Sequence, residues 1–239
     1  MGDVLLLRMK ALVGWCCFWV PYVALGLGVF PNRASARTSR PVSAGEVARA
    51  LALNASVTLV CALVLDAVAH GQPEAPPWPS SIVMRWILSL LLAEFCFYYS
   101  HRLLHLPWWY SRFHWKHHLF VRPYALAAVF CSPVEMLLCN VLAAAAGPYA
   151  FGMGTAEFGL WVLGGVGTSL ASHSGAAWFD GAHDLHHRVP TCNYSFMSLA
   201  DVLHGTYAVA SPAAARAARS DSACAELKDC PSVAARPRQ

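Results

Sequence analysis

Five long apolar segments constrain this chain more than any other feature. They cover roughly residues 11–30, 50–69, 82–100, 125–147 and 154–172, and each is close to the ~20 residues that a helix needs to cross a bilayer. The composition agrees, because 13% of the residues are charged, whereas soluble domains carry about 25%. These segments predict an all-α integral membrane protein with four to five transmembrane helices.

The segments also predict an order of parts along the chain. The first begins near Lys10, and its apolar core is too long for a signal peptide, so it predicts a membrane anchor. We expect N-terminal anchor helices over 1–81, a catalytic domain over 82–207 and a loosely ordered tail over 208–239, which is rich in Ala, Arg, Ser and Pro. The uncharged turn GPYAFGMG joins the last two segments into a helical hairpin.

The charges between the segments predict an orientation. Lys and Arg lie in 31–49, in 101–123 and after 173, whereas 69–81 contains neither. The positive-inside rule therefore places the first three regions in the cytoplasm, although Arg8 and Lys10 fit it less well. The net charge of +4, without a basic stripe, gives no reason to expect a nucleic-acid partner.

Histidines are concentrated in two windows of the expected cytosolic face. An 18-residue window should hold roughly one histidine at this composition, yet nine of the eleven lie in the two windows: His101, His105, His114, His117, His118, His173, His183, His186 and His187. Residues three or four apart share a helix face, and the spacings H-x3-H and H-x2-HH use this. Nine imidazoles suit two metals with about four or five ligands each, and imidazole alone fits zinc, copper, iron or nickel.

The same spacings carry a family resemblance. H-x3-H, H-x2-HH and a second H-x2-HH around a helical hairpin resemble the fatty acid hydroxylase/sterol desaturase superfamily. The resemblance runs from about Glu94 to Thr206 and includes EFCFYYSHRLLH, SPVE, SHSG and NYSFMSLADVLHGT. The last stretch is most similar to C4-methylsterol oxidases and to fatty acid hydroxylase domain-containing proteins.

The resemblance implies a membrane di-iron oxygenase of the endoplasmic reticulum. It would use O2 and electrons from cytochrome b5 or a reductase, and it would hydroxylate, oxidise at a methyl group or desaturate a sterol intermediate or another long lipid from the bilayer. The eight clustered histidines match the family motifs as metal ligands, and His173 in SHSG matches a further one. Zinc could replace iron in the purified protein, but a d10 zinc ion cannot supply the oxidation.

Nearby carboxylates are expected to hold the histidine rings. Metal-bound histidine usually donates its other N–H to a carboxylate or carbonyl, which points to Asp180, Asp184 and Asp201. Glu94 lies about two helical turns before His101 and would share its face, and Glu135 is a weaker choice by the same argument, since an acid at membrane depth is costly. Trp108, Trp109 and Tyr110 predict an aromatic belt at the membrane interface.

Two features leave alternatives open. The connection between His173 and His183 is shorter than in the sterol oxidases, and a displaced His183 would favour a catalytically silent metal-binding protein that scaffolds or regulates lipid metabolism. A metal transporter fits less well, because the histidines gather on one face. No dinucleotide or haem motif occurs, so electrons must come from outside. Basic residues near the clusters would dock an acidic donor or contact lipid headgroups: Arg112, Lys116, Arg122 and Arg188.

Overall fold

The computed structural model describes residues 12–24, 37–70, 78–174 and 181–209. This part is mostly helical, and the histidine-rich end carries its short irregular pieces. The α-helices are α2 (Ala44–His70), α3 (Ile82–Leu104), α4 (Pro107–Trp109), α5 (Pro133–Glu135), α6 (Ala143–Ala150), α7 (Thr155–His173), α8 (Ala182–Arg188) and α9 (Leu199–His204). Two π-helical turns, η2 (Tyr110–His114) and η5 (Met136–Leu142), two 3-10 turns, η3 (His117–Leu119) and η4 (Ala125–Val129), and two strands, β1 (Arg37–Thr38) and β2 (Phe120–Arg122), complete it.

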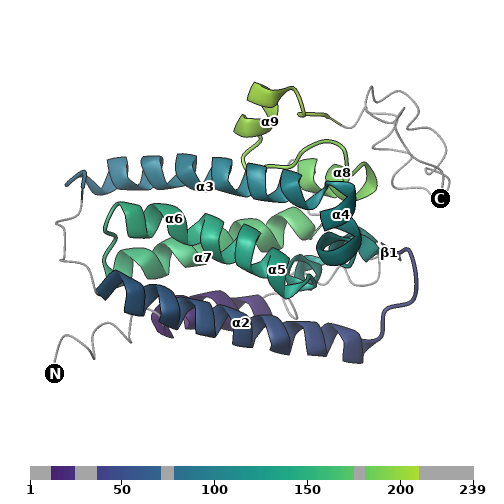
Figure 1. Cartoon of the computed structure of the whole chain (residues 1–239), viewed down its shortest axis with the longest axis horizontal. Helices are drawn as coiled ribbons and strands as arrows, with labels where there is room; N and C mark the ends of the chain where they lie inside the picture. The colour runs from purple at the N-terminus through teal and green to yellow at the C-terminus, as the bar shows by residue number, and fades with distance from the viewer. Residues whose placement is uncertain (1–11, 25–36, 71–77, 175–180, 210–239) are drawn as a thin grey trace.

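The long helices form a bundle with α2 along one side and α3 along the other. Helices α6 and α7 lie between them, and α4 and α8 cover one end (Figure 1). Helices α3 and α6 approach closely at Gly147, where an added Cβ would meet the Ser89 backbone at 2.5 Å. Strand β1 pairs antiparallel with β2 at the covered end, so residues 37–38 and 120–122 lie at the same end of the bundle.

Two helices in the described residues are long and apolar enough to cross a membrane, Ala44–Leu65 and Ile82–Leu104. The expected fifth segment forms α7, which does not meet the same criterion of length and hydropathy. The first segment forms a helix over Leu12–Ala24, which is apolar but shorter. It packs against the bundle through hydrogen bonds from the Trp15 indole to the Ala55 carbonyl and from the Trp19 indole to Thr58.

The prediction of a helix over the fourth segment, 125–147, is wrong at both ends. Its first residues form the buried turn η4, and a helix begins only at Pro133, where the Ser132 hydroxyl accepts the Glu135 amide. Proline at the first helical position and serine as N-cap explain this start. The helix continues through η5 and α6 to Ala150, so Gly147 and Pro148 of the expected turn are helical.

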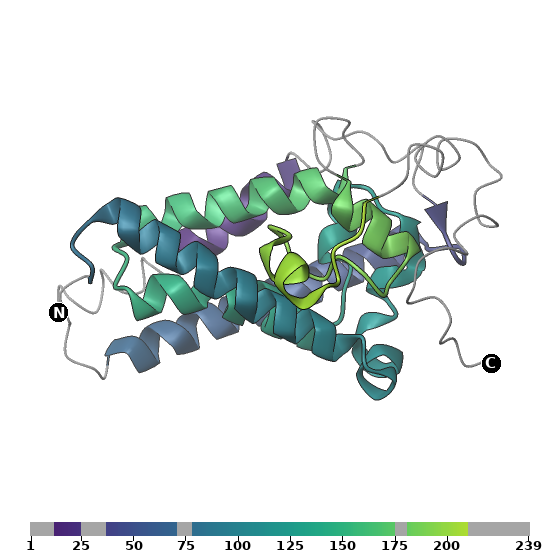
Figure 2. The same ribbon diagram turned by 90° about the horizontal axis from the view of Figure 1, so that it is seen from above.

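The end of the bundle away from the histidines is closed by a buried ion pair. Arg85 near the start of α3 makes a two-point contact with Glu157 of α7, at 3.2 Å and 2.9 Å. The same guanidinium donates to the carbonyls of Pro79 and Ser80. These contacts fix the height of α3 relative to α7, and therefore of His101 and His173 at the other ends of these helices. Figure 2 shows the bundle from above.

Candidate metal centre

The structure sorts the nine clustered histidines into two compact groups. The five-ring group contains His101, His105, His114, His118 and His186. The four-ring group contains His117, His173, His183 and His187. One ring nitrogen from each member lies within 4.8 Å of the others in its group, so each group is small enough to surround a single metal ion.

Helical geometry explains why neighbouring histidines join different groups. His117 and His118 are adjacent in η3, and His186 and His187 are adjacent in α8. Successive residues of a helix point about 100° apart, so one ring of each pair faces one group and the next ring faces the other. The two HH pairs therefore serve as the connection between the groups.

Backbone carbonyls hold three of the rings. The Nδ1 atoms of His101, His186 and His173 donate to the carbonyls of Tyr194 at 2.6 Å, Cys192 at 2.7 Å and Ser169 at 2.9 Å. A carbonyl can only accept, so the ring proton lies on Nδ1 and Nε2 keeps a free lone pair. Each of these rings thus presents Nε2 to its group in the tautomer that binds metals.

The nitrogen positions fit metal ions better than hydrogen bonds between rings. In the five-ring group, His101 Nε2 lies 3.1 Å from His114 Nε2 and His105 Nε2 lies 3.1 Å from His186 Nε2. In the four-ring group, His183 Nε2 and His173 Nε2 are 2.9 Å apart. Converging lone pairs repel unless a cation lies between them, and a cation held by several neutral imidazoles meets that need.

Burial keeps the rings neutral. Desolvation, strengthened by the neighbouring rings, lowers the pKa well below its usual value in His105, His114, His117, His118, His183, His186 and His187. Metal binding requires deprotonated ligand nitrogens, so the site needs no proton release from these rings near neutral pH.

Glu135 is the carboxylate that contacts rings of both groups. One of its oxygens lies 2.9 Å from Nδ1 of His114, and the other lies 3.7 Å from Nδ1 of His117. The shorter contact has the length of a hydrogen bond, but its direction is not that of one, and neither of the two atoms has a hydrogen-bond partner among the described residues. Glu135 is buried, so its carboxyl stands beside one ring of each group and away from water.

Three of the carboxylates that the sequence favoured as partners of the histidine rings bind other groups. Within the described residues Glu94 accepts the backbone amides of Met197 and Ala200, Asp184 pairs with Arg188, and Asp201 accepts from residues 194, 195 and 206. None of the three bonds a histidine of the two groups, so direct contact was the wrong expectation. Asp180 lies outside the described residues.

Asp201 acts on the site indirectly, through the backbone of residues 194 and 195. Its carboxylate binds the amides of Tyr194 and Ser195, and the Tyr194 carbonyl holds His101. Asn193, in the left-handed conformation at φ 56, bonds the Ala182 carbonyl and both backbone groups of Ala208. The carbonyl partners could not be predicted from residue types, because every residue has one.

The short connection before His183 does not displace that residue. Residues 175–180 lie outside the described part, but His183 reaches the four-ring group within 2.9 Å of His173. His204, outside the clusters, bonds Tyr99 and the Ala200 carbonyl instead. The main sequence argument for a defective site therefore loses its geometric basis.

An apolar cavity of about 410 Å³ ends on both histidine groups. Its lining includes His101 of the five-ring group and His117, His173 and His183 of the four-ring group. Away from the histidines the walls are formed by aromatic and aliphatic residues of the long helices, including Trp86, Leu90, Phe97, Phe158, Trp161 and Val162. The cavity can bring a hydrocarbon against the candidate metal positions while it excludes water.

Comparison with known proteins agrees with this architecture. The sequence profile described as Fatty acid hydroxylase matches residues 86–206, about half of the chain. The chain belongs to the fatty acid hydroxylase family. Every histidine of the two groups lies inside the matched region, which confirms the resemblance noted in the motifs. No solved structure matches the chain.

Individual relatives of this fatty acid hydroxylase family member carry different names. Fatty acid hydroxylase domain-containing protein 2 of Homo sapiens is 32% identical over 48% of this chain and 36% of its own length. A very-long-chain aldehyde decarbonylase of Oryza sativa subsp. indica is 32% identical over 48% and 46%, and methylsterol monooxygenase 2-2 of Arabidopsis thaliana is 28% identical over 71% of each chain. The chain thus spans less than half the length of the first two.

Proposed function

We propose that this protein oxidises a membrane lipid with O2, using two iron ions held by the two histidine groups. The observation that carries the proposal is the apolar cavity, because its inner end is lined by rings from both groups. A sterol intermediate is the favoured substrate, supported by the sterol monooxygenase among the relatives, and another long lipid is the alternative. The outcome would be hydroxylation, methyl oxidation or desaturation.

The membrane arrangement belongs to the same proposal. The protein would span the endoplasmic reticulum membrane with four to five helices, the histidine end would face the cytosol, and 82–207 would form the catalytic part behind the anchor helices of 1–81. Two candidate spans and the basic loops support this arrangement. The substrate would enter sideways from the bilayer, since an apolar molecule gains nothing by crossing water.

Residues of this chain would prepare the site for oxidation. Neutral rings supply the ligand nitrogens, the carbonyls of Tyr194, Cys192 and Ser169 fix three ring orientations, and Glu135 places its carboxyl beside one ring of each group. Phe97 and Trp161 line the cavity and would keep water from the reacting carbon. Iron bound there would supply the O2-dependent oxidation of an unactivated C–H bond.

The electrons would come from a separate protein. Hydroxylation places one oxygen atom of O2 in the product and reduces the other to water, which consumes two electrons and two protons. Cytochrome b5 or a reductase would supply the electrons. Of the basic residues near the site, Arg188 is paired with Asp184, Arg112 stacks on Trp108 and Lys116 lies over the Phe130 ring. Arg122 is therefore left as the better contact for an acidic donor.

The deciding experiment measures metal and turnover together. The protein is purified in detergent and reconstituted with iron, because zinc can occupy such sites during overexpression. We expect two iron ions per chain and oxidation of a sterol or fatty lipid in the presence of cytochrome b5, its reductase and O2. His117→Ala and His186→Ala should both abolish turnover, and His117→Ala should also lose the metal of the four-ring group. His204→Ala should keep metal and turnover, since His204 bonds Tyr99 outside the groups.

Two outcomes would contradict the proposal. Full turnover in His117→Ala or His186→Ala would exclude the ligand assignment. A stable protein that binds metal in both groups and oxidises none of the lipids would favour the silent scaffold.

A further inference from the structure

The short helix α9 leaves an apolar face uncovered. Within the described residues, Val202 is 59% exposed and Leu203 is 64% exposed. Four more apolar residues of 196–209, the α9 segment, are also exposed: Met197, Leu199, Tyr207 and Val209. The one Asp, Glu, Lys or Arg in this segment, Asp201, is fully buried. Such a face in water would lose the free energy that burial of apolar surface provides.

The α9 segment lies beside α3 rather than beyond its end. Figure 1 shows α9 against the side of α3, whereas α4 and α8 cover the end of the bundle. Glu94 accepts the amides of Met197 and Ala200 at 3.0 Å and 2.9 Å. Glu94 lies in a candidate membrane span, five to eight residues before the stretch from Tyr99 to Arg102. That is about 8–12 Å along the helix, well within a ~30 Å hydrocarbon layer.

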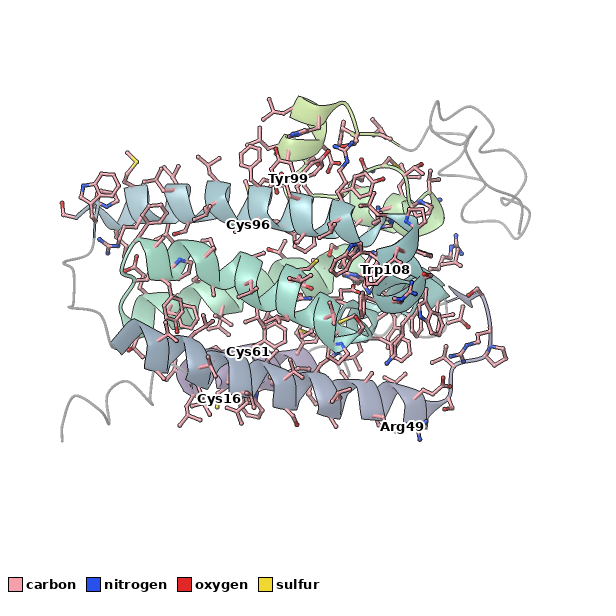
Figure 3. The ribbon with its side chains drawn as sticks, in the orientation of Figure 1. Cys16, Arg49, Cys61, Cys96, Tyr99 and Trp108 are labelled. Carbon is pink, nitrogen blue, oxygen red and sulfur yellow. The ribbon has the colours of Figure 1, made fainter. Side chains whose placement is uncertain are left out.

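The outer surface of α3 continues into this face. Val83, Ile87, Leu91, Phe95 and Tyr99 follow one another at four-residue intervals and form the α3 stripe. The stripe is exposed at Val83, Ile87, Leu91 and Tyr99. Helix α9 lies at the C-terminal end of the stripe, where Tyr99 bonds His204. Figure 3 shows Tyr99 on the side of α3 that carries α9, and Trp108 at the end of the bundle.

The backbone of the α9 segment has the internal partners that a bilayer demands. Irregular backbone at membrane depth is tolerated where its polar groups are bonded within the protein. Glu94 binds two of its amides, the Thr206 amide donates to the Asp201 carbonyl, and Asn193 binds both backbone groups of Ala208. A mid-span carboxylate on α3 thus acquires a role, which is to bind the start of α9.

We propose that the α9 segment lies in the hydrocarbon of the bilayer, with lipid acyl chains covering Val202 and Leu203. The proposal rests on the membrane arrangement of the proposed function. It places the membrane boundary between Tyr99 and Arg102, and therefore places the histidine groups at the interface. It also revises the sequence-based orientation, in which everything after 173 lies in the cytoplasm.

The test uses the full chain in nanodiscs with two carbene probes. One is a phospholipid with a diazirine near the middle of its acyl chain, and the other is a water-soluble diazirine. Labelled residues are located by peptide mass spectrometry. We expect the lipid probe to label the α9 segment within twofold of Ile87 and Leu91. The water-soluble probe should label residues 39–45, which are mostly exposed at the histidine end, at least fivefold more than the α9 segment.

Three results would overturn the proposal, and they differ in meaning. Labelling of the α3 stripe without the α9 segment by the lipid probe places α9 in water and leaves the proposed function standing. Protection of the α9 face from both probes means that a protein surface covers it. Absence of lipid labelling on both α3 and α9 removes the membrane arrangement itself. Metal content and lipid turnover, measured on the same sample, report separately on the proposed function.

Discussion

The two histidine groups use the same ligand type but are built differently. The five-ring group depends on the 192–195 loop, whose carbonyls hold His101 and His186. In the four-ring group His173 is held by its own helix, through the Ser169 carbonyl. Three of the four rings of the second group line the cavity, against His101 alone from the first. We therefore expect the four-ring group to meet the substrate. In the five-ring group, two rings are held by backbone carbonyls, against one in the four-ring group.

The largest effect should come from single alanine variants, in which one ring is removed from one group or from the other. His183→Ala leaves three nitrogens in its group, whereas His118→Ala leaves four in the other, the number that stable tetrahedral sites use. We expect His183→Ala to lose nearly one metal per chain and all turnover, and His118→Ala to keep most of its metal. Elemental analysis of the purified variants measures this, with His204→Ala as control. Equal losses would show that the groups are not distinguished by ligand number.

The metal-free protein should lose stability in acid. Burial lowers the pKa of rings in both groups below the usual value of 6.5, so the unfolded chain takes up protons first. Stability is therefore full above pH 6.5 and falls as the pH drops from 6.5 toward the lowered values, by about 1.4 kcal/mol per pH unit for each ring. Thermal unfolding of the metal-free protein between pH 7.5 and 5 measures it.

A constant unfolding midpoint over this range would contradict the assignment of buried neutral rings. The number of protons taken up gives a further check, because rings of both groups should contribute. A slope that fits only the four or five rings of one group would mean that the other group is already open to water without metal.

Glu135→Gln should weaken both groups together. The carboxyl beside His114 and His117 becomes an amide while the shape is kept, and changes of such partners typically cost 10–100-fold in metal affinity. Competition with a chelator measures the affinity of each metal. Glu46→Gln, at an exposed ion pair in the first turn of α2, serves as the matched control. Loss from one group alone would show that Glu135 supports only that group.

The sequence predicted the histidine site better than its surroundings. Spacing identified eight of the nine rings, because H-x3-H and H-x2-HH place side chains on shared helix faces, and His173 came from the resemblance at SHSG. It failed for Glu94, which is spaced correctly from His101 but bonds the backbone of Met197 and Ala200. Spacing along a helix gives a direction, but the partner in that direction comes from a distant segment.

The fold was predicted where apolar length was decisive. The segments 50–69 and 82–100 correspond to α2 and α3, whereas 125–147 merged the buried turn η4 with the helix that begins at Pro133. Hydropathy cannot separate a buried turn from a helix, although the Ser-Pro pair marks the boundary.

Asp201→Asn should give the smallest and most selective effect. The Asp201 carboxylate accepts four hydrogen bonds, including the amides of Tyr194 and Ser195, and an asparagine NH2 would face donors instead. The 192–195 loop should loosen, and the five-ring group should bind metal roughly threefold to tenfold more weakly, less than for a direct partner of a ligand. The four-ring group should be unchanged, because the Ser169 carbonyl that holds His173 belongs to α7.

Chelator competition on the two metals separates these outcomes, with Asp184→Asn as the matched control. Asp184 pairs with Arg188 on α8 and holds no carbonyl that binds a ring, so its change should leave both affinities within twofold. A loss shared by both groups in Asp201→Asn would mean that the HH pairs of η3 and α8 transmit the disturbance from one group to the other. The two groups would then be a single mechanical unit, and the contrast between them would be limited to their access to the cavity.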